Sequence, residues 1–314
     1  MSVLRLAPAC KDYVWGGDRL VREYNKRIIG DRLAESWELS CHPAGESIIA
    51  DGEAAGMGLG KYLKKRKPHV LGTNCMRYGH FPIMVKLIDA CENLSVQVHP
   101  PDSYALSHEG QYGKAEAWYV VDARPGAFLY CGLAREVSEE EFLCHVQDHT
   151  LQELLNPVEV QKGDVLFIEP GTIHAIGKGI LVAEIQQSSS LTYRLYDYGR
   201  PDNQGRLRPL QIDKALAVAA RKPPERRKSS VPHLVECRYF TVDKLYLDGG
   251  RMNCLKGTVG EDSFLHLLVL EGEGSIVCEG KQLRFRKGDS ILFTADSGAY
   301  EITGACEGLM TYIP

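Results

Sequence analysis

Ser95-Val96-Gln97-Val98-His99-Pro100 places two potential metal ligands two residues apart in an apolar, β-branched segment. Residues i and i+2 of a strand point to the same face, so we expect Gln97 and His99 to project together from a strand. A Gln-x-His pair alone is weak evidence, because a strand histidine is more often an ordinary core or surface residue. The pair becomes informative when other strands deliver further ligand-type side chains.

Two further segments each place one such side chain on an expected strand. Glu116 lies in Lys114-Ala115-Glu116-Ala117-Trp118-Tyr119-Val120-Val121, and His174 ends the segment 163–174. One amide oxygen, two imidazoles and one carboxylate form a mixed nitrogen and oxygen set that suits zinc or another divalent transition metal. The sequence therefore predicts short strands that enclose a metal site.

Two lysines near these segments are candidates for contacts with a substrate. The run 81–90 is almost continuously apolar, which is typical of a strand covered on both faces. Lys86 would need an anionic partner if it lies in a pocket, and the alternative is that its ammonium reaches solvent at the strand edge. Lys114 shares a strand face with Glu116 and is expected to contact a phosphate or hydroxyl group, or to form a salt bridge.

The segment 180–200 reads as a strand, a polar turn and a tyrosine-rich strand. Glu184 in the first strand and Arg194 in the second can return to the same cavity if the strands form a meander or a barrel. An arginine beside a cationic metal makes sense only with an anion between them. A phosphorylated or enediolate-forming substrate would supply that anion.

Composition limits the possible classes of function. The chain has 314 residues, 44% hydrophobic and 25% charged, and its net charge of -4 gives no general attraction to nucleic acid or to an anionic membrane. No apolar run approaches the roughly 18 residues that a membrane span needs, and residues 1–6 do not resemble a signal peptide. The ten cysteines include no Cys-x-x-Cys pair, so we expect free thiols in the cytoplasm.

Other segments give expectations for secondary structure. Gly16 and Gly17 are expected to supply unusual backbone angles in a turn before a short helix. Residues 100–105 read as a turn, residues 138–155 as a helix that begins with a capping box, and residues 208–220 as another helix.

Four motifs follow one another along the chain: Gln97-Val98-His99-Pro100, Lys114-Ala115-Glu116, Gly171-Thr172-Ile173-His174-Ala175 and Leu191-Thr192-Tyr193-Arg194-Leu195-Tyr196-Asp197. Together they resemble the zinc-dependent type I mannose-6-phosphate isomerases, in the short bacterial form. The resemblance covers most of residues 1–220, and its motifs are specific as a set although each alone is weak.

The resemblance implies a mainly β fold, with a cupin-type β-barrel, or jelly roll, and a few helices. It implies one zinc ion per chain, held by Gln97, His99, Glu116 and His174. The candidate catalytic residues are Arg194, Lys114 and Glu184, and the candidate substrate-binding residues are Lys86, Ser95, Lys114 and Arg194. The implied activity interconverts D-mannose 6-phosphate and D-fructose 6-phosphate in carbohydrate metabolism.

Such an isomerisation moves a proton between C1 and C2 through an enediolate, whose negative charge must be stabilised. A divalent metal with one carboxylate ligand keeps a net positive charge and can act as a Lewis acid. Glu184 and a metal-bound water are both candidates for the proton carrier. Two other functions stay open: a cupin enzyme of another reaction type, such as an iron-dependent oxygenase, and a non-catalytic sugar-phosphate sensor.

The chain is expected to form two units. Residues 1–220 would hold the metal site, residues 221–232 a basic linker, and residues 233–314 a second, degenerate cupin-like β unit. The turn at 287–289 repeats the turn at 162–164, but no histidine follows it, so the second unit is expected to bind no metal. The expected partner is a small sugar phosphate, and the expected assembly is a monomer or a weak homo-oligomer.

Overall fold

The computed structural model describes residues 3–28, 30, 32–66, 68–202, 204–224 and 233–314. The fold is mainly β, as predicted, and its sheets are antiparallel. Most of the expected linker 221–232 lies outside the described residues.

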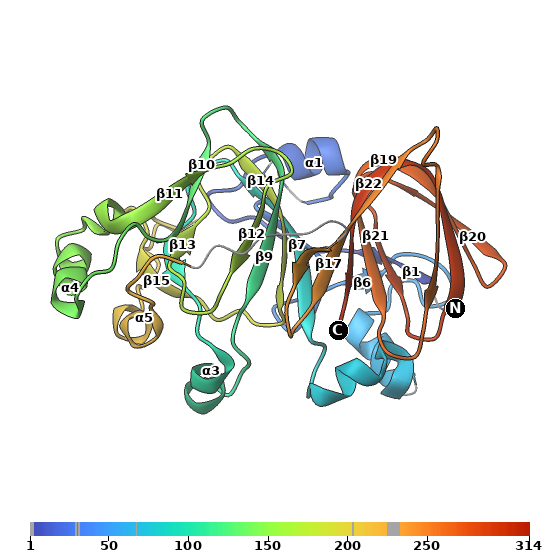
Figure 1. Ribbon diagram of the computed structural model, residues 1–314, viewed down its shortest axis with the longest axis horizontal. Helices are drawn as coiled ribbons and strands as arrows, with labels where there is room; N and C mark the ends of the chain where they lie inside the picture. The colour runs from blue at the N-terminus through green and yellow to red at the C-terminus, as the bar shows by residue number, and fades with distance from the viewer. Residues whose placement is uncertain (1–2, 29, 31, 67, 203, 225–232) are drawn as a thin grey trace.

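Two sheets form the first barrel, on the left and in the middle of Figure 1. The six-stranded sheet has the order β12 (Val165–Ile168), β9 (Glu116–Ala123), β14 (Ile180–Gln187), β7 (Ile83–Ala90), β3 (Glu35–Leu39) and β2 (Ala9–Lys11). The five-stranded sheet has the order β11 (Leu155–Glu159), β10 (Phe128–Leu133), β13 (His174–Ala175), β8 (Val96–Val98) and β15 (Tyr193–Tyr196). A separate short ribbon pairs β4 (Cys41–His42) with β5 (Gly45–Glu46).

The second unit is a nine-stranded sheet, on the right of Figure 1. Its main path is β16 (His233–Glu236), β17 (Thr241–Asp248), β22 (Gly298–Tyr312), β19 (Leu265–Cys278), β21 (Ser290–Phe293), β1 (Val3–Ala7) and β6 (Ile48–Ile49). β18 (Cys254–Val259) pairs with β22, and β20 (Lys281–Arg286) pairs with β19. Because β1 pairs with β21, the N-terminal strand extends the sheet of the second unit across the boundary expected at residue 220.

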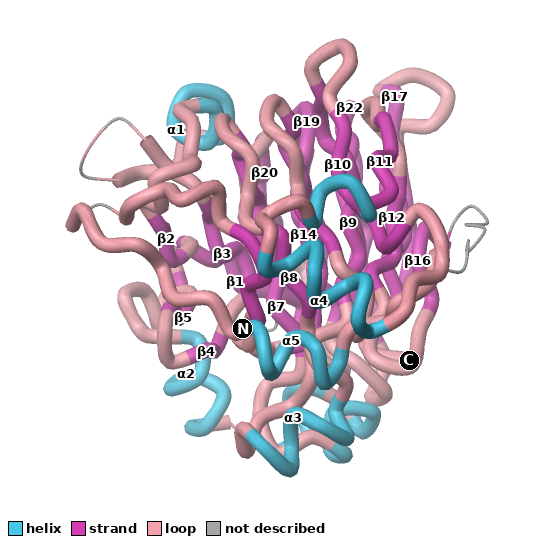
Figure 2. Tube along the Cα trace, turned by 90° about the vertical axis from the view of Figure 1, so that its left-hand side faces the viewer, coloured by secondary structure: helices cyan, strands magenta, loops and turns pink. Residues whose placement is uncertain are grey.

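Short helices connect the strands: α1 (Arg19–Tyr24), α2 (Leu59–Lys65), α3 (Asp102–His108), α4 (Glu139–Gln147), α5 (Ile212–Val218), and the 3₁₀ turns η1 (Pro68–Leu71), η2 (Thr73–Arg77) and η3 (Leu151–Leu154). In Figure 2, α4 and α5 lie in front of the strands of the first barrel. Phe142 and Ala215 of these helices share an apolar cluster with Val96 and Val98 of β8. The helices therefore cover one side of the five-stranded sheet.

Three expectations for the helices are wrong in their bounds. The helix expected over 138–155 is interrupted, because α4 ends at Gln147 and His149 adopts a left-handed φ of 58° before η3. The turn expected at 100–105 contains the start of α3, whose N-cap residue is Pro101 and whose first residue is Asp102. The helix expected over 208–220 is only the seven-residue α5.

The role expected for Gly16 and Gly17 is also wrong, since neither residue has a positive φ. A Cβ atom on Gly16 would lie 2.6 Å from the Cα of Ala34, and one on Gly17 would lie 2.2 Å from Oδ2 of Asp89. Gly16 is therefore required by its close approach to the backbone of Ala34, and Gly17 lies against the carboxylate of Asp89; neither has an unusual backbone angle.

The six-stranded sheet separates two cores. Ala117 and Tyr119 of β9 belong to a cluster that also contains Leu268 and Leu309 of the second unit. Trp118, between them in sequence, belongs to the core of the first barrel. Because alternate residues of a strand face opposite ways, one face of this sheet packs on the second unit and the other lines the barrel interior.

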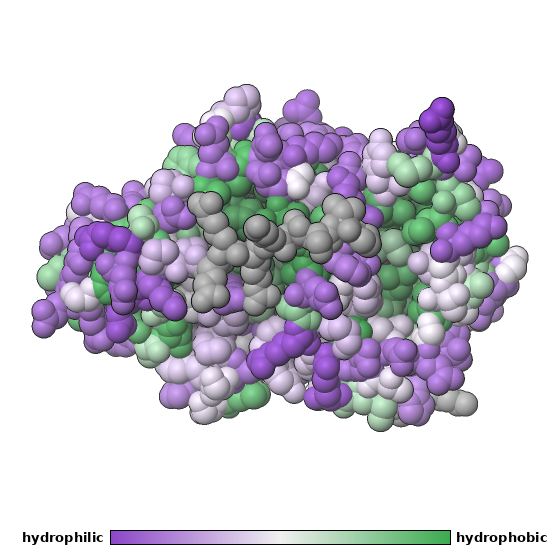
Figure 3. Space-filling model, in the orientation of Figure 1, coloured by the Kyte–Doolittle hydropathy of each residue, from purple (hydrophilic) through white to green (hydrophobic). Residues whose placement is uncertain are grey.

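The face of the molecule shown in Figure 3 is predominantly polar. In Figure 3 hydrophilic residues form most of the outline, and hydrophobic residues are visible over the strands of the second unit. None of the described helices is long and apolar enough to cross a membrane.

Candidate active site

The interior wall of the first barrel is built from cross-strand rows on β9, β14 and β7. One row contains Glu116, Gln186 and Met84, and the next contains Trp118, Glu184 and Lys86. The row below them is apolar and consists of Val120, Val182 and Ile88. Cross-strand partners share a face of the sheet, so these rows place a layer of polar side chains above an apolar floor.

Three of the predicted metal ligands meet beside this wall. The ligand-type atoms of His99, Glu116 and His174 all lie within 4.8 Å of one another, and the three side chains are buried. The two Nε2 atoms are 3.1 Å apart, and Oε1 of Glu116 is 3.2 Å from Nε2 of His99. The other oxygen, Oε2, is 3.7 Å from Nε2 of His174.

The protonation of these groups fits a divalent metal ion. Nδ1 of His174 lies 2.8 Å from the carbonyl oxygen of Thr172, so it donates its proton there and leaves the Nε2 lone pair facing the cluster. Burial lowers the pKa of His174, and burial together with the Lys114 ammonium lowers the pKa of His99 to about 3. Two neutral imidazoles whose Nε2 atoms converge on a carboxylate are a typical donor set for such an ion.

The carboxylate of Glu116 is held in its ionised form. Burial alone would raise its pKa, but the Lys114 ammonium holds the pKa well below the usual value. Nζ of Lys114 lies 2.7 Å from Oε1 of Glu116 and 3.2 Å from Nε2 of His99. The expected proximity of Lys114 and Glu116 is therefore observed, in the form of a buried ion pair.

Gln97 lies next to this cluster on β8, where it is the cross-strand partner of His174. Its Nε2 is 3.4 Å from Nε2 of His174, and a half-turn of the amide would bring the oxygen to this position. Oγ of Ser95 lies 3.4 Å from Oε1 of Gln97. Ser95, expected to bind substrate, thus contacts the side chain of a candidate metal ligand.

A second cluster of charged side chains surrounds Lys86, whose exposed fraction is 7%. Its Nζ lies 2.9 Å from Oε1 of Glu184 and 3.7 Å from Oε2 of Glu35. Burial alone would lower the pKa of Lys86, but these two carboxylates raise it. The ammonium has anionic partners in the barrel, and the alternative that it reaches solvent at a strand edge is wrong.

Glu184 links Lys86 to the histidine cluster. Its second oxygen, Oε2, accepts a hydrogen bond of 3.0 Å from Nε1 of Trp118, whose ring packs edge-on against His174 at 5.4 Å. Burial and the nearby charge of Glu116 raise the pKa of Glu184. A carboxyl group with a raised pKa holds a proton more readily than an ordinary one, which suits a general acid or base.

Arg194 lies on β15 as the cross-strand partner of Gln97. Its Nε is buried and has no hydrogen-bond partner among the described residues, and burial and the charge of Arg208 lower its pKa. The nearby Asp197 is bound by Arg208 at 2.6 Å and by Arg200 at 3.0 Å. Arg194 therefore forms no salt bridge with the described residues, and it is available to a bound anion.

Sequence reasoning missed three residues around this site. Trp118 follows Glu116 by two positions, and that spacing could have indicated that it faces the barrel. Glu35 also gave a signal, since polar and apolar residues alternate over 35–40, which predicts a strand. Tyr13 gave none. Burial and the charge of Glu35 raise the pKa of its phenol, whereas the charges of Lys86 and Arg194 act in the opposite direction.

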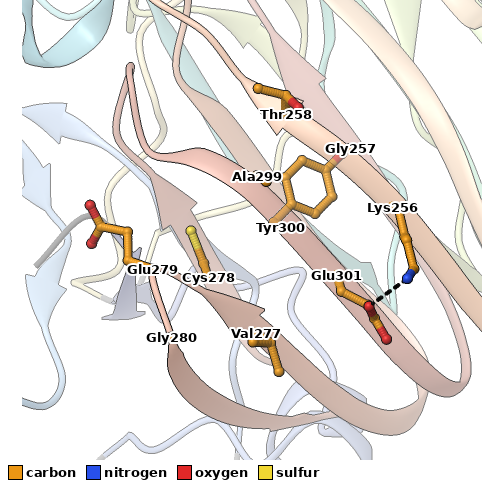
Figure 4. A pocket seen from close by; sticks show the side chains of 10 residues that line it. All are labelled: Lys256, Gly257, Thr258, Val277, Cys278, Glu279, Gly280, Ala299, Tyr300 and Glu301. Atoms are coloured by element: carbon orange, nitrogen blue, oxygen red, sulfur yellow. Dashed lines mark ion pairs between the residues drawn. The ribbon is translucent and has the colours of Figure 1, made fainter.

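A cavity of about 510 Å³ lies elsewhere, in the second unit between β18, β19 and β22. Figure 4 shows that its charged side chains include Lys256 and Glu301, which form an ion pair of 3.1 Å. It contains no histidine. The buried His266 of the second unit bonds Ser290 and is not part of a ligand cluster in the described residues. The candidate metal-binding cluster of the described residues therefore lies in the first barrel.

Comparisons with known proteins agree with this location. Residues 3–123 match the family model described as phosphomannose isomerase type I, catalytic domain, and residues 230–313 match mannose-6-phosphate isomerase, cupin domain. The chain is 35% identical to the mannose-6-phosphate isomerase ManA of Bacillus subtilis, over 98% of this chain and 97% of the relative. It is 34% identical to the mannose-6-phosphate isomerase of Streptococcus mutans, over 94% and 93% of the two chains.

The chain belongs to the type I mannose-6-phosphate isomerase family. The crystal structure of the mannose 6-phosphate isomerase from Bacillus subtilis superposes on it with a TM-score of 0.91 and 31% identity, over 100% of both chains. A putative mannosephosphate isomerase from Archaeoglobus fulgidus shares the fold, with a TM-score of 0.80 and 22% identity over 99% and 97% of the chains. The predicted resemblance and cupin fold are thus confirmed over the full length of this family member.

Proposed function

We propose that this protein interconverts mannose 6-phosphate and fructose 6-phosphate, with one zinc ion held by Gln97, His99, Glu116 and His174. The activity is that of the family. The observation that carries the metal site is the enclosed set of two neutral Nε2 atoms and one ionised carboxylate within 4.8 Å of one another. When bound there, a divalent ion polarises the substrate carbonyl and stabilises negative charge on the enediolate.

The other charged residues of the barrel divide the remaining tasks. Glu184 carries the proton between C1 and C2, supported by its raised pKa and by the hydrogen bond from Trp118. Lys86 stays protonated beside it because two carboxylates surround the ammonium. Arg194 pairs with the anionic substrate, supported by its lack of a salt bridge in the described chain, and Lys114 fixes the orientation of Glu116.

Ser95 is proposed to act by supporting the amide of Gln97, which is the contact it makes. The two units are proposed to be residues 1–220, with the metal site, and residues 233–314, without metal. The second unit would support the six-stranded sheet, since the cluster between them contains residues of both.

A coupled assay for conversion of mannose 6-phosphate tests the function. Activity is measured on the purified protein, after chelation, and after restoring zinc, with magnesium as the control ion and metal content determined in parallel. We expect turnover to be lost on chelation and restored by zinc under anaerobic conditions. A folded, zinc-loaded sample without turnover would overturn the proposal and favour a sugar-phosphate sensor.

A further inference from the structure

Gln186 occupies the middle of the polar wall of the site. Its cross-strand partners are Glu116 on β9 and Met84 on β7, and Glu184 lies two residues away on the same face of β14. The side chain of Gln186 is fully buried, at 0% exposure. It therefore adjoins both a candidate metal ligand and the proposed proton carrier.

The orientation of the Gln186 amide is determined by its hydrogen bonds. Nε2 donates to the carbonyl oxygens of Gln187, at 2.7 Å, and of Ser189, at 2.8 Å. Exchanging nitrogen and oxygen would set an amide oxygen against two carbonyl oxygens, so only the observed orientation is compatible with these neighbours. Both protons of the amide are used, whereas Oε1 is buried and has no hydrogen-bond partner among the described residues.

The described side chains next to Gln186 do not offer a free proton to this oxygen. Met84 has no polar hydrogen, and Glu116 is an ionised carboxylate. The two ammonium groups of the wall are already engaged, Lys86 with Glu184 and Lys114 with Glu116. A buried carbonyl oxygen without a donor is costly, so we expect its donor to belong to a bound molecule.

We propose that Oε1 of Gln186 accepts a hydrogen bond from the C3 or C4 hydroxyl group of the bound sugar and so selects the substrate. This inference rests on the proposed function, which makes the ligand a sugar phosphate. The carbon chain of a sugar carries several hydroxyl donors, whereas its carbonyl and a phosphate dianion are acceptors. A buried acceptor without a protein partner favours a sugar that carries the matching hydroxyl. A sugar that lacks this hydroxyl binds more weakly, because the acceptor then stays unpaired.

The test compares Gln186→Met with the unmodified protein on three substrates: mannose 6-phosphate and its 3-deoxy and 4-deoxy analogues. Methionine has a similar volume and no amide, so the loss of the contacts to Gln187 and Ser189 affects all three substrates equally. Met84→Leu, in the same cross-strand row, is the control for altered packing. Zinc content and the affinity for mannitol 6-phosphate, which has no carbonyl and does not react, are measured by metal analysis and calorimetry.

We expect Gln186→Met to lower kcat/KM for mannose 6-phosphate roughly tenfold more than for one of the two deoxy analogues, which corresponds to about 1.4 kcal/mol. The loss should reside mainly in KM, with a parallel loss of mannitol 6-phosphate affinity and full zinc content. Met84→Leu should change kcat/KM for all three substrates by the same factor. Equal losses on all three substrates in Gln186→Met, or no loss, would overturn the inference. Failure of the unmodified protein to turn over mannose 6-phosphate would instead contradict the proposed function.

Discussion

Glu184 is held through both of its carboxylate oxygens, and this limits the positions that the side chain can take. Lys86 binds one oxygen at 2.9 Å and Trp118 binds the other at 3.0 Å. A proton carrier fixed in this way can serve both C1 and C2 only if the substrate is bound with these atoms on the same side of the carboxylate. The geometry therefore makes positioning of the sugar as important as the acidity of Glu184.

The substitution Glu184→Gln tests this role. Glutamine keeps a similar shape and an oxygen for Trp118, but it cannot take up a proton, so we expect kcat to fall by roughly 10²- to 10⁴-fold. Zinc content should stay unchanged, because Glu184 is not in the ligand cluster. The control is Glu35→Gln, which alters the other carboxylate near Lys86 and should reduce kcat much less. Near-normal kcat in Glu184→Gln would assign the proton transfer to another group.

Parts of the site could be predicted from sequence where the two-residue alternation of side chains along one strand was sufficient. The spacing of two placed Lys114 beside Glu116, and the apolar run 81–90 indicated a strand whose single lysine needed an anion. Gln186 and Glu35 were not assigned, because cross-strand register decides their neighbours and register is set by pairing between distant segments. Spacing along one strand cannot show that Gln186 of β14 lies opposite Glu116 of β9.

Strands were predictable at the level of single elements, whereas helix ends and turns were not. The alternation or continuity of apolar residues marked β7 and β14, both of which are buried along their length. The left-handed His149 ends the helical segment so that the chain can enter β11, and only the tertiary path requires this. Gly16 is explained in the same way, since its constraint is contact with Ala34.

β19 contains a buried histidine that predicts sensitivity to acid. Nε2 of His266 lies 2.9 Å from Oγ of Ser290, which donates to the carbonyl oxygen of Glu38 at 2.8 Å, and Nδ1 has no partner in the described chain. Burial lowers the pKa of His266 to about 3, from a usual value of 6.5. The unfolded chain therefore binds the proton more readily between these values, and stability present above pH 6.5 is lost as the pH falls.

Between pH 7 and pH 5 this histidine should lower the free energy of unfolding by about 2 kcal/mol, at 1.36 kcal/mol per pH unit. The substitution His266→Leu removes the titrating group and should flatten the pH dependence by that amount, although it also removes the bond to Ser290 and lowers stability at pH 7. Urea unfolding of both proteins at several pH values measures the difference. Parallel pH profiles would contradict the role of His266.

At the scale of the whole molecule, the six-stranded sheet serves both units. Its inner face holds Glu116, Glu184 and Lys86, while Tyr119 on its outer face bonds Glu307 and Lys244 of the second unit. A unit without a metal cluster in its described residues can therefore still affect the site, because it supports the strand that holds Glu116. The sequence indicated a second cupin-like unit, but it did not reveal that β1 joins that unit's sheet.

A buried ion pair within residues 1–220 also contacts the second unit. Nζ of Lys26 lies 2.7 Å from Oε1 of Glu38 and 2.6 Å from the carbonyl oxygen of Gly288 in the second unit, and the exposures of the two side chains are 5% and 0%. Glu38 also accepts a hydrogen bond of 2.6 Å from Oγ of Ser36. Removing one charge leaves the other buried and unpaired, so we expect Lys26→Met to lower the free energy of unfolding by about 3–5 kcal/mol.

The double variant Lys26→Met, Glu38→Met separates the cost of an unpaired charge from loss of the contact itself. Two well-packed apolar side chains can replace a buried ion pair at little cost, so we expect the double variant to recover most of the stability that Lys26→Met loses. Recovery should be incomplete, because Ser36 and the carbonyl of Gly288 each lose a partner. Urea unfolding measures the free energy of unfolding of the unmodified protein, of Lys26→Met and of the double variant, each loaded with zinc. A double variant no more stable than Lys26→Met would mean that the stability depends on the specific geometry of the ion pair and of the bond from Lys26 to Gly288, and that an apolar contact cannot replace them.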